Sequence, residues 1–307
     1  MVAFADSVEY ARRLLPLAEW RACSRDELEP EVQVVLERLQ PGGHWLRSEW
    51  QPAGFARIVL VESAPSSQFD VLRELSGRDQ LPAGGTLCVA GSGAAFHGHR
   101  QRAWVALPGN LHVSVVFTPE CVVPHHGASF MALPAVAAAS AIESALRVTK
   151  AVGIKWVNDV LIEGAKVAGV IAHTSAVGDR VARVVLGIGL NVEATPQIDR
   201  CPFVPRAGSL RQYDREVTQA EVFSCLLEHL AGEYQALLRR GPSPLLAAYR
   251  RRSVVIGRHV EVDSEGTAAT AVVAGRVQSI GDDLELILEE RSAPVVRGRL
   301  RFRAPGA

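Results

Sequence analysis

Lysine is rare in this chain, and one lysine lies in a segment whose residue types could do chemistry. Of the 33 basic residues only Lys150, Lys155 and Lys166 are lysines. Lys155 opens the run Lys-Trp-Val-Asn-Asp, so that Asn158 and Asp159 follow it inside an apolar stretch. Polar groups in such a stretch cost stability unless each is paired, and functional sites are where this rule is broken. An ammonium group here could neutralise a carboxylate and a phosphate that react with each other.

The spacing of the charged groups in this region predicts how they face one another. If residues 154–162 form one extended strand, Lys155 and Asp159 lie on the same face. Residues 163–165 read Glu-Gly-Ala, which predicts the turn of a β-hairpin. The return strand of that hairpin begins at Lys166, so we expect Lys166 beside the same site.

Asparagine is as rare as lysine, and its other two positions mark two further candidate segments. Asn110 follows Pro108 and Gly109 directly before a strand pattern, where it could also be an ordinary turn residue. Asn191 ends the run Gly-Ile-Gly-Leu-Asn, whose glycines permit a ligand to approach the backbone closely. A strand with a bulge explains the same run without a ligand.

The segment 96–104, Phe-His-Gly-His-Arg-Gln-Arg-Ala-Trp, is the richest in basic groups. Such a loop could fold over a phosphate, with Trp104 offering a flat face to a purine. Its histidines add positive charge in mildly acid solution. A solvated basic loop anchored by Trp104 is the alternative interpretation. The residues concerned are His97, Gly98, His99, Arg100 and Arg102.

The composition excludes several classes of protein. Basic and acidic residues number 33 each, so no overall field attracts nucleic acid or an anionic membrane. The five cysteines form no CxxC pair, and the glycines at 91 and 93 lack the third glycine of a dinucleotide-binding loop. We find neither a signal-peptide pattern nor an apolar run of about 20 residues. A cytoplasmic protein without a dedicated metal site is therefore expected.

Hydrophobic periodicity divides the chain into three parts. Residues 1–50 predict helices and connectors, an accessory segment with no helix-turn-helix. Residues 51–248 alternate between strand and helix patterns, which predicts a mixed α/β (α+β) domain. In it, Leu111, Val113, Val115 and Phe117 share one face of a strand. Residues 249–307 contain only short strands, which predicts a small SH3-like barrel.

Several motifs together resemble those of the biotin protein ligase (biotin–acetyl-CoA-carboxylase ligase) family. They are Trp104 with the following Pro-Gly-Asn-Leu, then K-W-x-N-D, G-x-K-x-A-G-V and G-I-G-x-N-V, in this order. The resemblance covers residues 57–303. It implies a catalytic domain related to class II aminoacyl-tRNA synthetases and lipoate ligases, followed by an SH3-like domain. It also implies formation of biotinyl-5′-AMP from biotin and ATP with Mg²⁺, then transfer of biotin to a lysine of biotin carboxyl carrier protein.

The resemblance also implies roles for individual residues. Lys155 would be catalytic, together with Asp159. Ser63 would correspond to the serine of the family's Ser-Thr-Asn segment, and Gly93 stands where the family has a glutamine. The family's Gly-Arg-Gly-Arg-x-Gly-Arg loop keeps only two matches here, at Gly98 and Arg102. The implied biotin-binding residues are Ser63, Gly93, His97, Lys155, Lys166 and Gly169. The implied nucleotide-binding residues are Gly98, His99, Arg100, Arg102, Trp104, Asn110, Asn158 and Asn191.

Three alternatives remain open from the sequence. A lipoate or octanoate ligase could use the same scaffold with an apolar tunnel in place of partners for a polar ring. A non-catalytic relative could bind only a ligand or a carrier protein. A nucleic-acid module is disfavoured by the balanced charge and the low aromatic content of 6%. A homodimer is compatible with the sequence.

Overall fold

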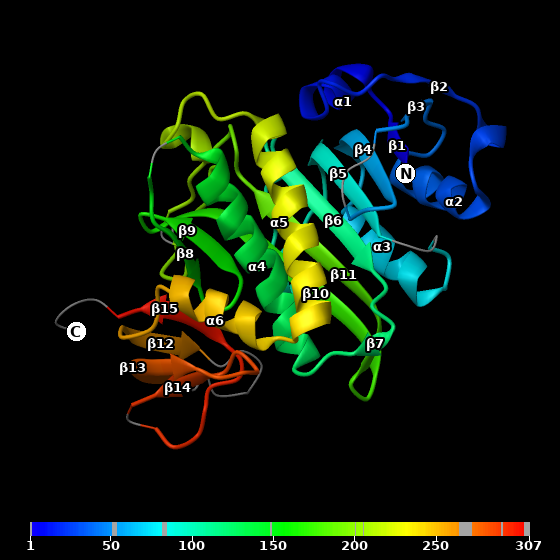
Figure 1. Ribbon diagram of the computed structural model, residues 1–307. Helices are drawn as coiled ribbons and strands as arrows, with labels where there is room; N and C mark the ends of the chain where they lie inside the picture. Colours follow the sequence, from blue (N-terminus) through cyan, green and yellow to red (C-terminus); the bar gives the residue numbers. More distant parts are fainter. Residues whose placement is uncertain are drawn as a thin grey trace.

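The computed structural model describes residues 2–50, 54–81, 85–147, 149–199, 201–204, 206–263, 272–289 and 291–303. They form a mixed α/β body built on one large sheet, with a smaller antiparallel sheet beside it (Figure 1). The path of the large sheet runs β2-β3-β1-β4-β5-β6-β11-β10-β9-β8, and β7 pairs with β11. Only the β1–β4 and β4–β5 pairs are parallel. The strands are β1 (Val2–Ala5), β2 (Arg21–Cys23), β3 (Trp45–Ser48), β4 (Arg57–Ala64), β5 (Thr86–Gly93), β6 (Leu111–Phe117), β7 (Cys121–Val122), β8 (Val152–Lys155), β9 (Asp159–Ile162), β10 (Ala165–Val177) and β11 (Arg180–Leu190).

Helices cover both faces of this sheet. The long helices α4 (His126–Ala145) and α5 (Gln219–Arg240) lie side by side on one face (Figure 1). Helices α2 (Pro30–Leu39) and α3 (Gln68–Gly77) contribute to the apolar core on the other face. The alternation predicted for β6 is confirmed, because Leu111, Val113, Val115 and Phe117 join the α4/α5 core while Val116 joins the opposite one. The remaining helices are α1 (Val8–Leu14) and α6 (Ser243–Arg252), with short 3₁₀ turns at Arg25–Glu27, His99–Gln101 and Leu210–Gln212.

Helix α4 corrects one expectation from the sequence. Among the described residues it is the one helix long and apolar enough to cross a membrane. Its small side chains allow close packing, however, and 78% of its most apolar window is buried inside the protein. By itself this composition is weak evidence for a membrane span, because core helices share it.

The N-terminal segment contains more than the helices and connectors predicted for residues 1–50. Strand β1 pairs with β4, and β3 and β2 extend the sheet beyond β1. Their sequences are short, at three or four residues each, so hydrophobic periodicity could not reveal them. The segment is therefore continuous with the large sheet.

The C-terminal strands form a separate antiparallel sheet in the order β14-β13-β12-β15. They are β12 (His259–Asp263), β13 (Val272–Ile280), β14 (Leu286–Leu288) and β15 (Arg299–Phe302). Residues 264–271, in which part of the predicted turn and strand falls, lie outside the described residues. The boundary expected between residues 248 and 249 falls inside α6. Tyr249 of that helix is fully buried in the α4/α5 core, so the helix belongs to the main body.

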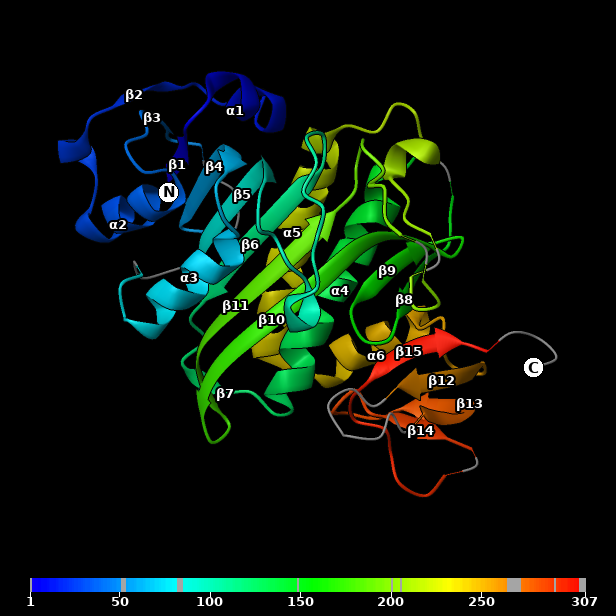
Figure 2. The same ribbon diagram turned by 180° about the vertical axis from the view of Figure 1, so that it is seen from behind.

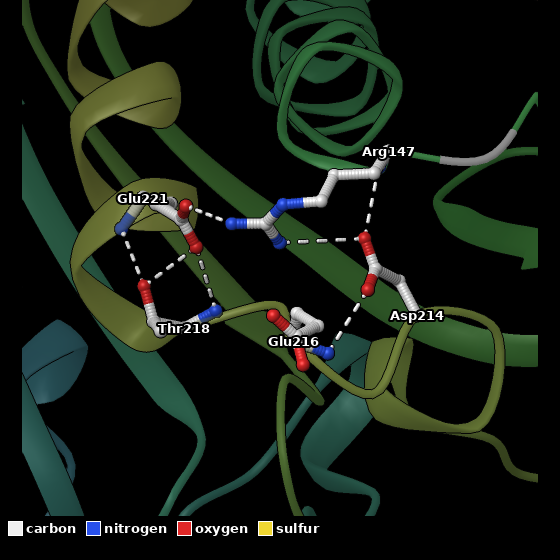
Figure 3. A network of polar contacts seen from close by, with 5 residues as sticks. All are labelled: Arg147, Asp214, Glu216, Thr218 and Glu221. Carbon is white, nitrogen blue, oxygen red and sulfur yellow. Dashed lines mark hydrogen bonds and ion pairs between the residues drawn. The ribbon is translucent and has the colours of Figure 1, made fainter.

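A polar network fixes the segment that leads from the centre of the sheet to α5 (Figure 3). Arg147, just after α4, forms ion pairs with Asp214 at 3.5 Å and with Glu221 at 2.5 Å. Its backbone N–H also donates to Asp214, and this hydrogen bond is the main cause of the lowered pKa of that carboxyl group. Thr218 caps α5 by accepting from the backbone N–H of Glu221. The network thereby fixes the chain that follows the end of β11.

Candidate active site

The candidate site is a cavity of about 250 Å³ on the face of the sheet opposite α4 and α5. The start of α3, the 96–105 loop and strands β6, β9, β10 and β11 line it, and Arg299 of β15 reaches it from the small sheet. Figure 2 shows this face, with the long strands β10 and β11 running beneath the 96–105 loop. Of the residues predicted for the site, the cavity is lined by His97, Gly98, His99, Arg102, Trp104, Asn158, Asp159, Lys166, Gly169 and Asn191.

Trp104 is part of the cavity wall and packs closely on β10 and β11. A Cβ atom at Gly189 would lie 2.4 Å from its indole, so glycine is required there, and one at Gly169 would make a tight contact of 3.2 Å. The indole N–H donates to Nδ1 of His112 at 3.3 Å. Burial lowers the pKa of His112 to about 4, which keeps its ring a neutral acceptor at neutral pH. Lys166 Nζ stands 5.5 Å from the indole ring centre.

The run from Lys155 to Asp159 is a turn, and the prediction of one extended strand was wrong. Strand β8 ends at Lys155 and β9 begins at Asp159, so that the two residues face each other as a pair across the ladder. Asn158 closes the turn against β10 by donating to the carbonyl of Val170 at 2.8 Å. The polar residues that looked misplaced in a strand are therefore held by a tight turn.

Lys155 is buried beside the cavity. Its side chain does not line the cavity wall, but Nζ donates to the carbonyl of Phe203 at 2.6 Å, and the residue is only 6% exposed. Burial lowers the pKa of this ammonium group, Asp159 opposes the shift, and Lys166 and Arg299 add to it. Asp159 in turn pairs with Lys166 at 2.5 Å. The cations of Lys155, Lys166 and Arg299 thus lie near the carboxylate of Asp159 at the cavity. This arrangement suits an anionic ligand.

Because its pKa is lowered, Lys155 should lose its charge at a lower pH than an ordinary lysine does. Any reaction of an anionic substrate in this cavity should then slow above that pH. Below its depressed pKa the ammonium is charged and binds anions; above it the charge is lost. We therefore expect kcat/KM to fall as pH rises through a value below 10.5, because kcat/KM reports groups of the free enzyme. The measurement is the pH profile of the wild type and of Lys155→Arg. The residual activity of Lys155→Arg should lack this limb, because guanidinium does not deprotonate. A limb shared by both proteins would assign the titration elsewhere.

The 96–105 loop is folded back on itself. Gly98 N–H donates to Arg102 O at 2.7 Å and Trp104 N–H donates to Phe96 O at 2.9 Å. His97 lies 2.5 Å from Asp70 of α3 through Nε2 and 3.1 Å from Gly98 O through Nδ1. Both ring nitrogens therefore face oxygen atoms of neighbouring residues. The loop is thereby attached to α3.

Besides Lys155, four predicted residues do not line the cavity. Ser63 is exposed, and Ser67 and Gln68 at the start of α3 line the cavity instead. Gly93 is outside the cavity wall, because the ring of Phe96 packs against it and leaves 2.3 Å for a Cβ atom.

Asn110 and Arg100 are likewise not part of the cavity wall. Asn110 is fully buried, and its side chain accepts from the backbone N–H groups of Val192 and Ala194, each at 3.0 Å. Its amide holds the end of β11, which is a structural role. Asn191 is fixed there too, because its amide donates to Gly208 O at 2.9 Å. Arg100 sits at the exposed tip of the loop, in left-handed backbone conformation.

Sequence reasoning missed several cavity residues besides Ser67 and Gln68. His112 and Ser114 alternate on β6 and point to the cavity side, opposite the apolar face that was recognised. That alternation was the available signal. Arg299 reaches the cavity from a distant strand, and its guanidinium lies 4.0 Å from the ring centre of Phe203. No local sequence pattern predicts such a contact.

Known proteins resemble this chain in sequence and in fold. Residues 67–191 match the model of the biotin/lipoate A/B protein ligase family. The biotin–[acetyl-CoA-carboxylase] ligase of Mycobacterium tuberculosis is 31% identical over 250 residues, which cover 80% of this chain and 87% of that protein. The chain belongs to the biotin protein ligase family. The bifunctional ligase/repressor BirA of Bacillus subtilis is 29% identical over 207 residues, and the match spans only 62% of its length.

The fold agrees with this family membership. The biotin protein ligase of Aquifex aeolicus, solved in complex with biotin and ATP, superposes with a TM-score of 0.63 at 20% identity. The likeness covers 81% of this chain and 100% of that one. The mixed sheet predicted from the sequence is therefore the fold of a biotin protein ligase.

Proposed function

We propose that this protein is an ATP-dependent biotin ligase. It would form biotinyl-5′-AMP from biotin and ATP, and then transfer the biotinyl group to a lysine of a carrier protein. The observation that carries the proposal is the placement of buried Lys155 with Asp159, Lys166 and Arg299 at a cavity that is also lined by serine hydroxyl groups. The relatives from Mycobacterium tuberculosis and Paracoccus denitrificans, which are named biotin–[acetyl-CoA-carboxylase] ligases, support the same activity.

The cations of Lys155, Lys166 and Arg299 suit the first step. A carboxylate oxygen of biotin attacks the α-phosphorus of ATP, the bond to the β-phosphate oxygen breaks, and pyrophosphate leaves. Lys155 would draw the two anions together and neutralise the charge that builds up on the phosphoryl oxygens. Lys166 is held by Asp159 and lies over Trp104, so it would support the same charge from the β10 side. Trp104 would give the adenylate a flat apolar surface.

The second step needs little more from the chain. The neutral amine of an acceptor lysine attacks the acyl carbon of the adenylate, AMP leaves with the electrons of the acyl–oxygen bond, and the proton lost by the attacking nitrogen passes to solvent. Lys155 and Lys166 would stabilise the departing phosphate. The acceptor we propose is biotin carboxyl carrier protein or a similar carrier.

The serines of the cavity wall favour biotin over lipoate or octanoate. Ser67 and Ser114 are both buried and line the cavity, and the side chain of Ser67 does not cap α3. The register places Ser114 opposite Gly187 of β11, two residues along from Gly189 beneath Trp104. A polar ring such as the ureido group would satisfy these hydroxyls, whereas an alkyl chain would leave them unpaired.

Removal of one hydroxyl group tests whether these serines bind biotin. We expect Ser114→Ala to raise KM for biotin about tenfold, the effect of one lost hydrogen bond of about 1.4 kcal/mol, with kcat nearly unchanged. Ser175→Ala, on the exposed part of β10, is the matched control and should behave as the wild type. Steady-state kinetics with biotin as the varied substrate decides. An unchanged KM in Ser114→Ala would remove this serine from the biotin site.

Several finer points complete the proposal. No group of three or more His, Cys, Asp or Glu side chains gathers into a metal site in the described part of the chain. We propose that Mg²⁺ enters bound to the ATP phosphates. We also propose that the small sheet is an SH3-like barrel, that the catalytic body extends to the end of α6 at Arg252 with the small C-terminal sheet after it, and that the enzyme works in the cytoplasm. Since β1 joins residues 2–48 to the large sheet, we assign them to the catalytic body rather than to DNA binding. A homodimer is part of the same proposal.

Pyrophosphate release with a panel of carboxylic acids tests the proposed function. We expect release from ATP with biotin and little with lipoate or octanoate. Release with octanoate alone would make the protein a fatty-acyl or lipoyl ligase. Binding of biotin without any pyrophosphate release would make it a non-catalytic relative.

A further inference from the structure

The turn that carries the catalytic lysine is fixed from three directions. Its first residue, Trp156, donates its indole N–H to the carbonyl of Leu284 at 2.6 Å. Its second residue, Val157, accepts from the hydroxyl of Tyr249 in α6 at 2.9 Å. Its third residue, Asn158, bonds to β10, as described above. Each residue between Lys155 and Asp159 thus has its own anchor.

The anchor of Trp156 belongs to the small C-terminal sheet. Leu284 lies in the turn between β13 and β14, is nearly fully buried, and has a backbone φ of 60°. The turn is closed by hydrogen bonds from Gly281 N–H to Glu285 O and from Asp283 N–H to Glu285 Oε2, both at 2.9 Å. The carbonyl that meets the indole is therefore held in one direction.

The same turn is attached to the main body at two further points. Arg250 of α6 donates to the carbonyl of Ile280 at 2.7 Å and pairs with Asp282 at 2.5 Å. His125, at the start of α4, pairs with Asp283 at 2.9 Å. The ion pairs of Asp282 and Asp283 are exposed to solvent and the Arg250–Ile280 hydrogen bond is partly buried, whereas the Trp156 contact is buried. Trp156 itself is 7% exposed. The buried hydrogen bond is the one that reaches the catalytic turn.

We propose that the β13–β14 turn of the C-terminal sheet positions the catalytic turn through Trp156, which makes this sheet part of the apparatus for adenylate formation. Trp156 is a positioning residue, because it acts through the neighbouring Lys155 and touches neither substrate. Without the carbonyl of Leu284, the indole turns and Lys155 loses its fixed direction toward the cavity. This inference rests on the proposed ligase function and deepens it.

The test compares two tryptophan substitutions in the full-length protein. Trp156→Phe keeps an aromatic ring and removes the N–H donor. Trp20→Phe is the matched control, because the indole N–H of Trp20 is buried without a hydrogen-bond partner among the described residues. We measure biotin-dependent ATP–pyrophosphate exchange, with kcat and KM for biotin separately, the pH profile of kcat/KM, and the urea midpoint of unfolding.

We expect Trp156→Phe to lower kcat about tenfold to a hundredfold, the effect of a small misplacement of a catalytic group, with KM for biotin changed less than threefold. The high-pH limb of kcat/KM should move toward the ordinary lysine range as Lys155 gains access to solvent. Trp20→Phe should match the wild type. A second variant, Arg250→Gln, loosens the β13–β14 turn without touching Trp156 and should lower kcat in the same direction.

Different outcomes separate the two claims. A wild type without exchange overturns the proposed function. An active wild type with an equally active Trp156→Phe overturns the positioning role alone. If Trp156→Phe lowers only the urea midpoint, with kcat per folded molecule and the pH limb unchanged, Trp156 is structural and the inference is wrong. If Trp156→Phe does not fold, Arg250→Gln decides instead. A kcat and a high-pH limb of kcat/KM equal to those of the wild type in Arg250→Gln would show that the inference is wrong.

Discussion

Replacing Lys155 by alanine should abolish biotin-dependent pyrophosphate release, with a fall in kcat/KM of about a thousandfold. The loss corresponds to about 4 kcal/mol of transition-state stabilisation, the usual effect of removing one preorganised electrostatic group. Lys155 is the buried cation of the β8–β9 turn, and its neighbours Lys166 and Arg299 approach from other strands. They contribute charge, but neither occupies the position between the turn and the Phe203 carbonyl.

Lys150→Ala is the matched control for this substitution. Lys150 pairs with Glu163 on the surface at 2.7 Å, far less buried than Lys155, and an exposed pair of this kind contributes little to stability. We expect wild-type kinetics from it. The far-ultraviolet circular dichroism spectrum of Lys155→Ala should match the wild type, because the change removes a buried charge rather than a core contact. Near-normal turnover in Lys155→Ala would refute the role assigned to this lysine.

Gly189→Ala should damage the site almost as severely. The added Cβ atom would lie 2.4 Å from the Trp104 indole, so the ring must leave its place between β10 and β11. We expect kcat/KM for biotin and for ATP to fall about a hundredfold, and the free energy of unfolding to fall by about 1–3 kcal/mol, as is usual for overpacking. Steady-state kinetics and urea unfolding measure the two effects.

Gly232→Ala provides the control for the glycine substitution. Gly232 lies within α5, and a Cβ atom there meets no atom within 4 Å. Alanine favours helix, so this variant should gain about 0.5–1 kcal/mol of stability and keep full activity. Wild-type affinity in Gly189→Ala would show that the indole position does not matter for substrate binding.

The rarity of lysine and asparagine drew attention to residues near the cavity, but it did not indicate the role of each one. Lys166 and Asn191 line the cavity and Lys155 lies beside it, whereas the side chain of Asn110 holds the end of β11. An asparagine whose side chain binds backbone groups and one whose side chain binds a ligand look the same in the sequence. Only the partners in the folded chain distinguish them.

Local patterns predicted the longer strands of the large sheet but not its short strands, the tight turn or the distant contacts. The run 155–159 alternates like a strand, and its turn is imposed by anchors on α6, β10 and the small sheet. Short strands such as β1 are fixed by pairing with β4, not by their own pattern. Ser63 was assigned from its correspondence to the family's Ser-Thr-Asn segment, whereas the serine that lines the cavity before α3 is Ser67.

The direct test of the central claim is detection of biotinyl-5′-AMP by mass spectrometry. The wild type and Lys155→Ala are each incubated with biotin, ATP and Mg²⁺, with pyrophosphatase present to draw the reaction forward. Our account predicts the acyl-adenylate from the wild type and none above background from Lys155→Ala. Equal adenylate from both proteins, or none from the wild type, would contradict it.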